Sequence, residues 1–174
     1  MFESEAPALS IRAIKNCLEG FAEPAAITHL VTVSCTGMSA PGLDLQIMET
    51  LRLSPNIFRT SVNFMGCYAA VHALKLARLI CDANPEALVL IVDTELCTLH
   101  FQQKYTPDNA ASSLLFSDGS AAVLVSGKKG NGLSIDGFYS QVAFRGKSDM
   151  SWQLGSKGFL MQLSGYVPQL VQED

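Results

Sequence analysis

The pattern of hydrophobic and polar residues predicts alternating helices and strands in the first part of the chain. Apolar residues recur at helical spacing from Leu9 to Phe21, which predicts an amphipathic helix with Gly20 near its end. Residues 28–34 form a β-branched, mostly apolar run that is typical of a strand. The Gly/Pro-containing residues 37–42 predict a loop, and residues 43–53 a short helix.

A second strand and helix are predicted on either side of a Gly-Cys dipeptide. Residues 58–63 indicate a strand, and the chain then passes through Gly66 and Cys67 into a helix over residues 68–81. This helix is apolar on nearly every side, so we expect it to be buried. The continuous apolar run at 87–92 predicts a strand covered on both faces. The alternation predicts a layered α/β fold with a largely parallel sheet.

The pattern weakens after residue 100. Residues 102–113 form a polar stretch for which no element is predicted. Asp118 and Gly119 predict a turn ahead of a strand that runs to Ser126. Residues 128–132 are typical of a turn or linker, and residues 133–144 predict a further strand.

Composition favours a protein with much buried surface. Hydrophobic residues make up 48% of the chain and charged residues 16%, and the mean hydropathy is +0.24. Since no segment is long enough to span a bilayer, this indicates a large core or a broad subunit interface. The N-terminus lacks the features of a secretion signal, so we expect a cytoplasmic protein. A net charge of -4 argues against a nucleic-acid partner.

The cysteines indicate reduced thiols. The chain contains five, an odd number without Cys-x-x-Cys spacing, which fits a cytosolic protein better than a disulfide framework. The pair Cys97 and His100 has no second pair to complete a zinc site, so we expect no bound metal.

Cys67 is the candidate nucleophile. Gly66 allows a sharp bend, and a cysteine on the first turn of a helix lies beside unpaired backbone N–H groups and the positive end of the helix dipole. Both favour the thiolate. Taken without its neighbours, a cysteine in an apolar context is more often an inert core residue, and the surrounding motifs reverse that balance.

Four separated stretches resemble the type III polyketide synthases, the family of chalcone synthase, which has the thiolase fold. They are residues 27–31 with Thr36-Gly-Met-Ser-Ala-Pro-Gly-Leu-Asp44, the turn Gly66-Cys67-Tyr68-Ala69, Leu115-Phe-Ser-Asp-Gly-Ser-Ala-Ala122, and residues 155–171. The resemblance implies an incomplete thiolase-like α/β/α fold. Residues 1–130 would be a partial N-terminal domain that carries the nucleophile, and 131–174 the beginning of the C-terminal domain.

The resemblance also implies the chemistry. Cys67 would accept the acyl group of a starter acyl-CoA, and malonyl-CoA would lose carbon dioxide to give an enolate that attacks the Cys67 thioester in a Claisen condensation. Coenzyme A thioesters would be substrates, no resident cofactor is expected, and the family implies a homodimer.

The catalytic histidine and asparagine of the family are not matched in this chain. Its three histidines, His29, His72 and His100, fall at other positions. We therefore expect a fragment of a longer chain that is inactive alone. Two alternatives stay open: an enzyme like 3-oxoacyl-[acyl-carrier-protein] synthase III, and a non-catalytic dimerisation module. Asp93 and Glu95 are expected to orient loop backbone rather than to act as an acid/base pair.

Six positions align with the family's substrate cavity. Phe116 matches a phenylalanine that gates the passage from the coenzyme A tunnel, and Met161 stands where plant enzymes have a second gating phenylalanine. The remaining four are Ala40 in place of a methionine, Trp152 in place of a glycine, Cys35 and Cys97. For Cys35 and Cys97, packing in the protein interior is as good an interpretation as a place in the wall of the substrate cavity. Trp152 is more typical of bacterial members, so phloroglucinol-, resorcinol- or pyrone-type products are as plausible as chalcones.

Overall fold

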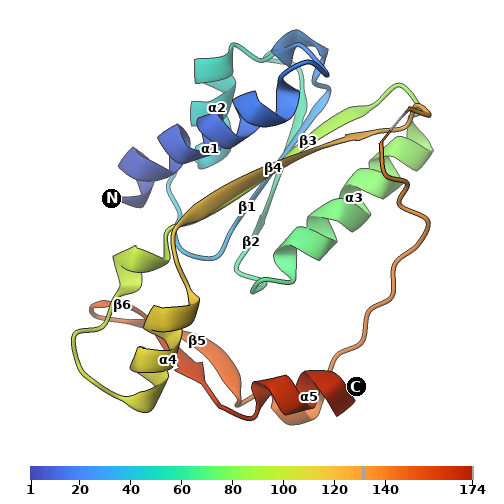
Figure 1. The fold of residues 1–174 in the computed structure, drawn as a ribbon. Helices are drawn as coiled ribbons and strands as arrows, with labels where there is room; N and C mark the ends of the chain where they lie inside the picture. The colour runs from blue at the N-terminus through green and yellow to red at the C-terminus, as the bar shows by residue number, and fades with distance from the viewer. Residues whose placement is uncertain (131, 174) are drawn as a thin grey trace. The chain divides into compact units, whose positions relative to one another are not determined.

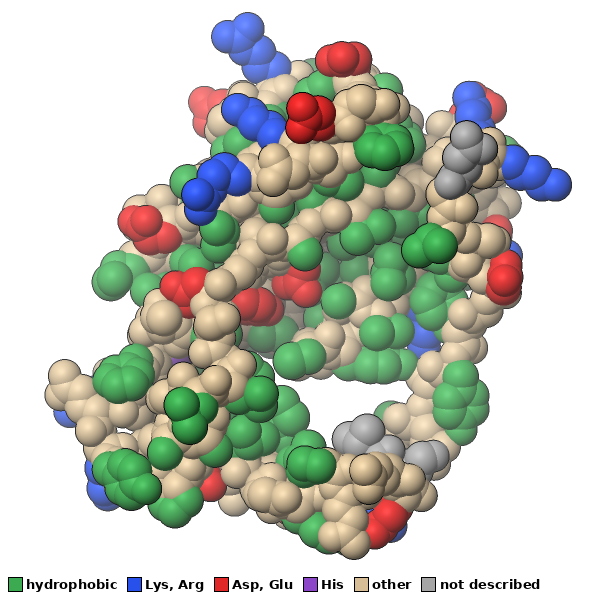
Figure 2. Space-filling model, viewed as in Figure 1, with side chains coloured by type: hydrophobic (Ala, Val, Ile, Leu, Met, Phe, Trp, Pro, Cys, Tyr) green, Lys and Arg blue, Asp and Glu red, His purple; other side chains and the backbone are tan. Residues whose placement is uncertain are grey.

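The structure is a computed structural model that describes residues 1–130 and 132–173. The chain divides into two compact units, each described by itself below. The first contains Met1–Leu96 and Gly119–Gly137, and the second contains Cys97–Asp118 with the chain from Phe138 onward. Figure 1 shows the elements of both units, and Figure 2 shows hydrophobic side chains on the viewed surface of each.

A four-stranded sheet forms the centre of the first unit. Its strands lie in the order β2 (Phe58–Asn63), β1 (His29–Ser34), β3 (Leu88–Glu95) and β4 (Gly119–Ser126). The first three run parallel and β4 is antiparallel to β3. The predicted strands and the largely parallel sheet are therefore confirmed.

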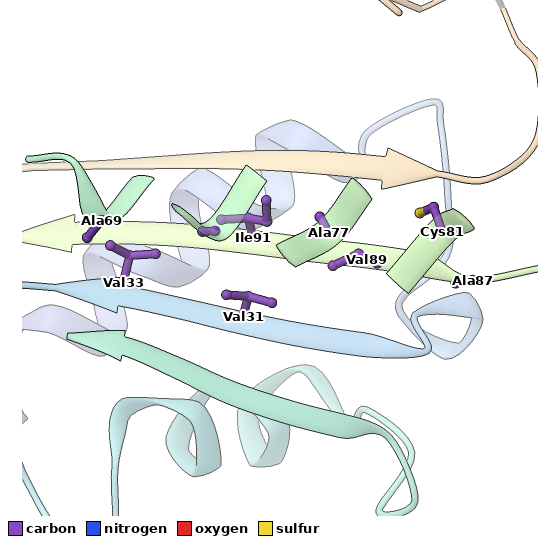
Figure 3. Close-up of a cluster of buried hydrophobic side chains, with 9 residues drawn as sticks. Val31, Val33, Ala69, Ala77, Cys81, Ala87, Val89 and Ile91 are labelled. Carbon is purple, nitrogen blue, oxygen red and sulfur yellow. The ribbon is translucent and has the colours of Figure 1, made fainter. Parts of the chain in front are cut away.

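Helices cover both faces of this sheet, which confirms the predicted layered α/β/α fold. Helices α1 (Phe2–Leu18) and α2 (Leu43–Leu51) lie on one face and α3 (Ala69–Ala83) on the other (Figure 1). Side chains alternate along the strands. Val31 and Val33 pack with Val89 and Ile91 against α3 (Figure 3). On the α1 side, the hydroxyls of Ser10 and Thr94 are hydrogen-bonded at 2.7 Å.

Helix α1 begins earlier and ends sooner than the sequence pattern predicted. Its buried stripe starts at Ala6, before Pro7, and continues through Ser10, Ile14 and Leu18. Two acidic residues in the first turn suit the positive end of the helix dipole. Gly20, with φ +75°, follows the end of the helix. Phe21, the last residue of the predicted helix, lies beyond the helix and is exposed.

Helix α3 is buried along one face only, so the prediction that it is enclosed on nearly all sides is wrong. The buried face consists of Ala69, Ala73, Ala77 and Cys81, spaced four residues apart. Leu79, by contrast, is 66% exposed. Small side chains let the helix approach the sheet closely, while its larger apolar residues lie toward the flanks.

Two further helical segments, α2 and a short 3₁₀ turn, complete the first unit. Helix α2 ends at Leu51 because Arg52 takes a left-handed conformation, two residues before the predicted end. A short 3₁₀ turn, η1 (Pro24–Ala26), precedes β1. No helix in the described part of the chain is both long and apolar enough to cross a membrane.

The second unit contains helices and a β-hairpin that the pattern did not predict. The hairpin joins β5 (Met150–Gly155) and β6 (Gly158–Leu163) in antiparallel pairing. The other elements are η2 (Cys97–His100), α4 (Pro107–Leu115), η3 (Phe144–Gly146) and α5 (Val167–Glu173). Helix α4 lies in the stretch where no element was predicted. Its start is capped by Thr106, whose Oγ1 accepts the Asn109 N–H at 3.0 Å.

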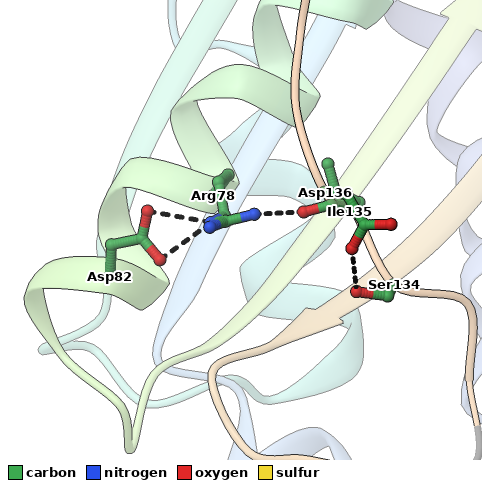
Figure 4. Close-up of polar contacts among 5 residues, drawn as sticks. All are labelled: Arg78, Asp82, Ser134, Ile135 and Asp136. Carbon is green, nitrogen blue, oxygen red and sulfur yellow. Dashed lines mark hydrogen bonds and ion pairs between the residues drawn. The ribbon is translucent and has the colours of Figure 1, made fainter.

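The strand predicted over residues 133–144 is wrong. Apart from η3, the described residues of this segment have no regular structure, and Leu133, Tyr139, Val142 and Phe144 are exposed. A strand requires a partner to satisfy its backbone. The start of the segment contacts α3 and not a partner strand. Arg78 of α3 forms an ion pair with Asp82 and donates a hydrogen bond to the Ile135 carbonyl (Figure 4). The division at residue 130 stays a prediction.

Candidate active site

The turn that carries Cys67 lies between β2 and α3. Phe64 donates its N–H to the Ser34 carbonyl at 3.1 Å, which ties the end of β2 to the end of β1. Gly66 has φ +68°, a conformation that glycine adopts without strain, and its carbonyl accepts the Ala69 N–H at 2.9 Å. Cys67 is exposed and precedes the helix, which begins at Ala69. The predicted place on the first helical turn is therefore wrong: Cys67 lies in the turn that leads into the helix.

Cys35 lies beside this turn. It follows β1, and its Sγ donates a hydrogen bond to the Gly66 carbonyl at 3.5 Å. Burial raises the pKa of the Cys35 thiol, and the nearby Glu95 carboxylate raises it further, against the opposing effect of backbone contacts. Cys35 is thus held as a neutral thiol next to the residue that precedes Cys67.

Glu95 organises the loop in which Cys35 lies. Its carboxylate accepts the Cys35 N–H at 2.7 and 3.0 Å and the Thr36 hydroxyl at 2.6 Å. Burial raises the Glu95 pKa, and these hydrogen bonds oppose the shift. The expectation that this carboxylate orients loop backbone is confirmed.

Asp93 lies two residues earlier on the same strand. Burial, assisted by the charge of Glu95, raises the pKa of Asp93 to about 6. Its Oδ1 is buried and has no hydrogen-bond partner in the described part of the chain. Ala40, the last aligned position in this unit, is exposed in the loop that precedes α2.

The second unit brings the other four aligned residues together. Cys97, Phe116, Trp152 and Met161 all line a cavity of about 80 Å³. Trp152 and Met161 are directly opposite each other across the β5–β6 hairpin. Phe116 follows the last residue of α4, and Cys97 begins η2. The structure thus makes these four residues neighbours, while Cys35, Ala40 and Cys67 belong to the first unit.

His100 lines the same cavity, whereas from the sequence it was considered only as a metal ligand with Cys97 and as a candidate catalytic histidine. Its Nδ1 accepts the Phe159 N–H at 3.1 Å, and its ring lies 4.5 Å from the Phe159 ring. Gly158, with φ +102°, makes this contact possible because a Cβ there would meet His100 Nδ1 at 2.8 Å. The sequence feature that could have indicated this position is the spacing Cys97-x-x-His100, because it places both residues on one short 3₁₀ turn.

The other histidines contact aromatic rings. His29 stacks on Phe58 at 5.1 Å, and its Nδ1 is hydrogen-bonded to the Thr28 hydroxyl. His72 meets the Tyr68 ring edge to face at 4.6 Å. Among residues 1–130 and 132–173, no three His, Cys, Asp or Glu side chains are grouped so that they could hold a metal ion.

Comparison with known proteins identifies the family. The family model described as chalcone and stilbene synthases, N-terminal domain, matches residues 1–129. The chain belongs to this family.

Relatives of this chalcone and stilbene synthase chain include two bacterial proteins. It is 38% identical over 126 residues to the "Alpha-pyrone synthesis polyketide synthase-like Pks18" of Mycobacterium tuberculosis, a match that covers 72% of this chain and 32% of the relative. It is 33% identical over 150 residues to the "Putative chalcone synthase" of Bacillus subtilis, covering 81% of this chain and 41% of the relative. The chain therefore spans less than half the length of these relatives.

Solved structures of type III polyketide synthases have the same fold. PKS-I from the brown alga Ectocarpus siliculosus superposes with a TM-score of 0.91 at 26% identity, covering 99% of this chain and 47% of that one. Tetrahydroxynaphthalene synthase from Streptomyces coelicolor gives 0.85 at 26% identity, with coverage of 99% and 49%. The fold of this family member is thus thiolase-like and incomplete. The match favours a polyketide synthase over the carrier-protein synthase alternative.

Proposed function

We propose that this chain is the nucleophile-bearing part of a type III polyketide synthase. Cys67 attacks the thioester of an acyl-CoA starter, so that an acyl-S bond to Cys67 forms and coenzyme A leaves as its thiolate. Malonyl-CoA then loses carbon dioxide, and the resulting enolate attacks the Cys67 thioester in a Claisen condensation. Coenzyme A thioesters are substrates in this reaction and not resident cofactors.

The position of Cys67 is the observation that carries this proposal. Among the cysteines, Cys67 alone is classed as exposed, Cys81 is buried, and Cys17, Cys35 and Cys97 are partly covered. An inert core cysteine would be enclosed by apolar side chains. Cys67 instead lies on an exposed turn at the carboxyl ends of two parallel strands, where ligands bind in open α/β sheets.

The cavity of the second unit fits the role of an acyl-chain pocket. Phe116 and Met161 supply apolar surface, and Cys97 and Trp152 complete the wall. In the first unit we assign Cys35 to the surroundings of the nucleophile, as a neutral thiol that does not compete with Cys67 for the acyl group. Ala40 we assign to substrate binding, as its alignment with the family's cavity implies.

We also propose that two copies of the chain form a homodimer. Strand β2 lies at the edge of the sheet, and its residues are exposed except for the partly buried Val62. An open strand edge of this kind favours pairing with another chain.

Acylation of Cys67 tests the catalytic proposal. The purified chain is incubated with acetyl-CoA or hexanoyl-CoA, and its intact mass is measured before and after treatment with hydroxylamine, which cleaves thioesters. We expect a mass gain of one acyl group that hydroxylamine removes. Peptide mapping should place the group on Cys67.

Two variants serve as matched controls. Cys67→Ala should abolish acylation, whereas Cys35→Ala, which removes the neighbouring neutral thiol, should retain it. Acylation that persists in Cys67→Ala, or an unmodified wild-type chain in which iodoacetamide also fails to label Cys67, would contradict the proposal and favour a non-catalytic interaction module.

A further inference from the structure

Two cysteines of the first unit lie where β1 and β2 end side by side. These strands run parallel, and Ser34 at the end of β1 is paired with Asn63 at the end of β2. Cys35 follows Ser34 directly, and Cys67 lies on the turn that follows β2. Because parallel strands end at the same edge of a sheet, the fold brings the two thiols to one place although they are far apart in the sequence.

The Cys35 sulfur lies against the backbone of the turn that carries Cys67. Its Sγ donates to the Gly66 carbonyl at 3.5 Å, and backbone groups of Phe64 and Met65 also act on this thiol. The Gly66 oxygen and the Cys67 Cα belong to one planar trans peptide and are about 2.8 Å apart. The Cys35 Sγ therefore lies no more than about 6.5 Å from the Cys67 Cα. Since the two Cα atoms of a disulfide are about 4.4–6.8 Å apart, a bond between the sulfurs needs only a small adjustment of the exposed turn.

The two thiols differ in the way that an oxidised and a resolving cysteine must. Cys67 is exposed, so a small oxidant in solution reaches its sulfur. Cys35 is partly covered, and both oxygens of the Glu95 carboxylate hold its N–H at 2.7 and 3.0 Å. Burial and the charge of Glu95 raise the pKa of the Cys35 thiol, which makes it the less reactive of the two toward an oxidant.

The other cysteines of the first unit are poorly placed to react with Cys67. Cys81 is buried in α3, about 18 Å from the start of that helix at about 1.5 Å per residue. Cys17 lies in the last turn of α1 beside the backbone of Leu124 in β4. Two strands separate β4 from β2 in the sheet. Within this unit, Cys35 is therefore the neighbour of Cys67.

We propose that Cys35 and Cys67 are a redox modification site: hydrogen peroxide joins them in a reversible disulfide. The Cys67 thiolate attacks one peroxide oxygen, so that an S–O bond forms, the O–O bond breaks and hydroxide leaves. The Cys35 Sγ then attacks the sulfur of this sulfenic acid. An S–S bond forms, the S–O bond breaks, and the oxygen leaves as water with the Cys35 proton. The two sulfurs together lose two electrons, and one peroxide is reduced to two waters.

The disulfide would both block and protect Cys67. A sulfur bonded to Cys35 cannot attack an acyl-CoA, and this consequence rests on the proposed function, whereas formation of the bond does not. A sulfenic acid without a neighbouring thiol is oxidised further to sulfinic acid, which thiol reductants do not reverse. Cys35 therefore keeps the oxidation of Cys67 at a reversible stage.

Mass spectrometry of the oxidised whole chain tests this proposal. The reduced chain is treated with stoichiometric hydrogen peroxide, and its free thiols are then blocked with N-ethylmaleimide in the absence of reductant. We expect a single chain in which two thiols escape blocking. Cleavage after Lys and Arg should yield residues 60–75 linked to residues 16–52, and fragmentation should place the bond on Cys35 and not on Cys17. Acylation of Cys67 by acetyl-CoA should be lost in the oxidised chain and return with dithiothreitol.

Two variants sharpen the test. In Cys35→Ala, Cys67 should gain two oxygens as sulfinic acid, whereas Cys17→Ala, which changes the other cysteine of the same peptide, should keep the link. The proposal is overturned if peroxide leaves Cys67 a free thiol, if Cys67 pairs with another cysteine, or if it reaches sulfinic acid as fast in the wild type as in Cys35→Ala. A link in a chain whose reduced Cys67 accepts no acyl group would contradict the proposed function alone, so the two can fail separately.

Discussion

At the scale of single residues, Glu95 shows how a buried carboxylate fixes the geometry near the nucleophile. Strand β1 ends at Ser34, and the chain that follows must leave the sheet with its backbone N–H groups satisfied. Glu95, at the end of the neighbouring strand β3, accepts from Cys35 and Thr36 at once. The loop therefore takes one position, and Cys35 Sγ reaches the carbonyl of Gly66.

Replacing Glu95 by Gln should loosen this loop. The amide offers one acceptor oxygen where the carboxylate has two, and its NH₂ group would face the Cys35 N–H, so we expect a loss of about 1–3 kcal/mol in the free energy of unfolding, measured in urea. Iodoacetamide should also label Cys35 faster. Glu86→Gln, which alters an exposed ion pair with Lys128, should change stability by less than about 0.5 kcal/mol. Equal effects of the two variants would refute this role of Glu95.

Asp93 should make stability depend on pH. Its pKa of about 6 in the folded chain lies above the ordinary value of 3.8, so the folded state holds a proton that the unfolded state releases. The contribution of Asp93 is therefore fully favourable below about pH 4 and is lost as the pH rises through 6. Asp93→Asn should make the free energy of unfolding less dependent on pH. Above pH 7 we expect the free energy of unfolding of the variant to exceed that of the wild type by about 1–2 kcal/mol, a moderate gain because the Asp93 carboxyl is only partly shielded from water. Urea unfolding between pH 4 and 8 measures the difference, and parallel curves for the two proteins would contradict it.

At the scale of elements, helix α3 depends on small side chains for its contact with the sheet. Ala77 is fully buried, and Figure 3 shows it against Val89 and Ile91 of β3. Since interiors are closely packed, Ala77→Leu should destabilise the chain by about 1–3 kcal/mol through overpacking. Leu79→Ala, on the exposed side of the same helix, should lower the free energy of unfolding by less than about 1 kcal/mol, because Leu79 is 66% exposed. Urea unfolding measures the free energy of unfolding of both variants. A larger loss for Leu79→Ala would show that the buried face has been misidentified.

The sequence predicted the elements whose signals are local. Strands β1, β2, β3 and β4 have apolar runs bounded by turn residues, and their positions agreed with the structure. The degree of burial of α3 could not be predicted in this way, because it depends on which neighbours lie beside the helix. The strand expected over 133–144 failed for the same reason: alternating apolar residues indicate a strand only if a partner strand is present.

The hairpin β5–β6 and helix α4, by contrast, are present in the structure but were not predicted. Both have signals that a closer analysis of the sequence could have used: Thr106-Pro107 is an N-cap followed by proline at the first helical position, and Gly155-Ser-Lys-Gly158 provides a tight turn. For the candidate site, the family resemblance named Cys97, Phe116, Trp152 and Met161 as cavity residues, and all four line one cavity in the structure. That this cavity binds substrate stays a prediction. The resemblance did not reveal His100, whose part in the wall follows from a backbone contact with Phe159.

At the scale of the whole molecule, the open edge of β2 should govern association of two copies. Thr60 is exposed on this strand, and a glutamate at this position would place like charges close together if two such edges meet. We expect Thr60→Glu to raise the dimer dissociation constant about tenfold or more in sedimentation equilibrium. Thr50→Glu, at another exposed threonine, on α2, should leave it unchanged. A monomeric wild-type chain, or equal effects of both variants, would contradict the proposed homodimer.

The placement of the histidines predicts that this chain can be acylated but cannot complete the condensation alone. Decarboxylation of malonyl-CoA requires donors directed at the developing enolate oxygen, and loss of one such donor typically costs about 10²–10³ in rate. His29 begins β1, whereas Cys35, the neighbour of the nucleophile turn, follows the end of that strand, about 17–20 Å away at about 3.3 Å per residue. The His72 ring packs against Tyr68, and His100 Nδ1 accepts the Phe159 N–H.

We therefore expect carbon dioxide release from malonyl-CoA at the rate measured without protein, even where the wild-type Cys67 becomes acylated. The measurement is release of labelled carbon dioxide from [3-¹⁴C]malonyl-CoA by the purified chain. Release above that background would show that the chain itself supplies the missing donor. His72→Ala and His100→Ala would then identify which histidine it is, because only the donor's removal should reduce decarboxylation while leaving acylation of Cys67 intact.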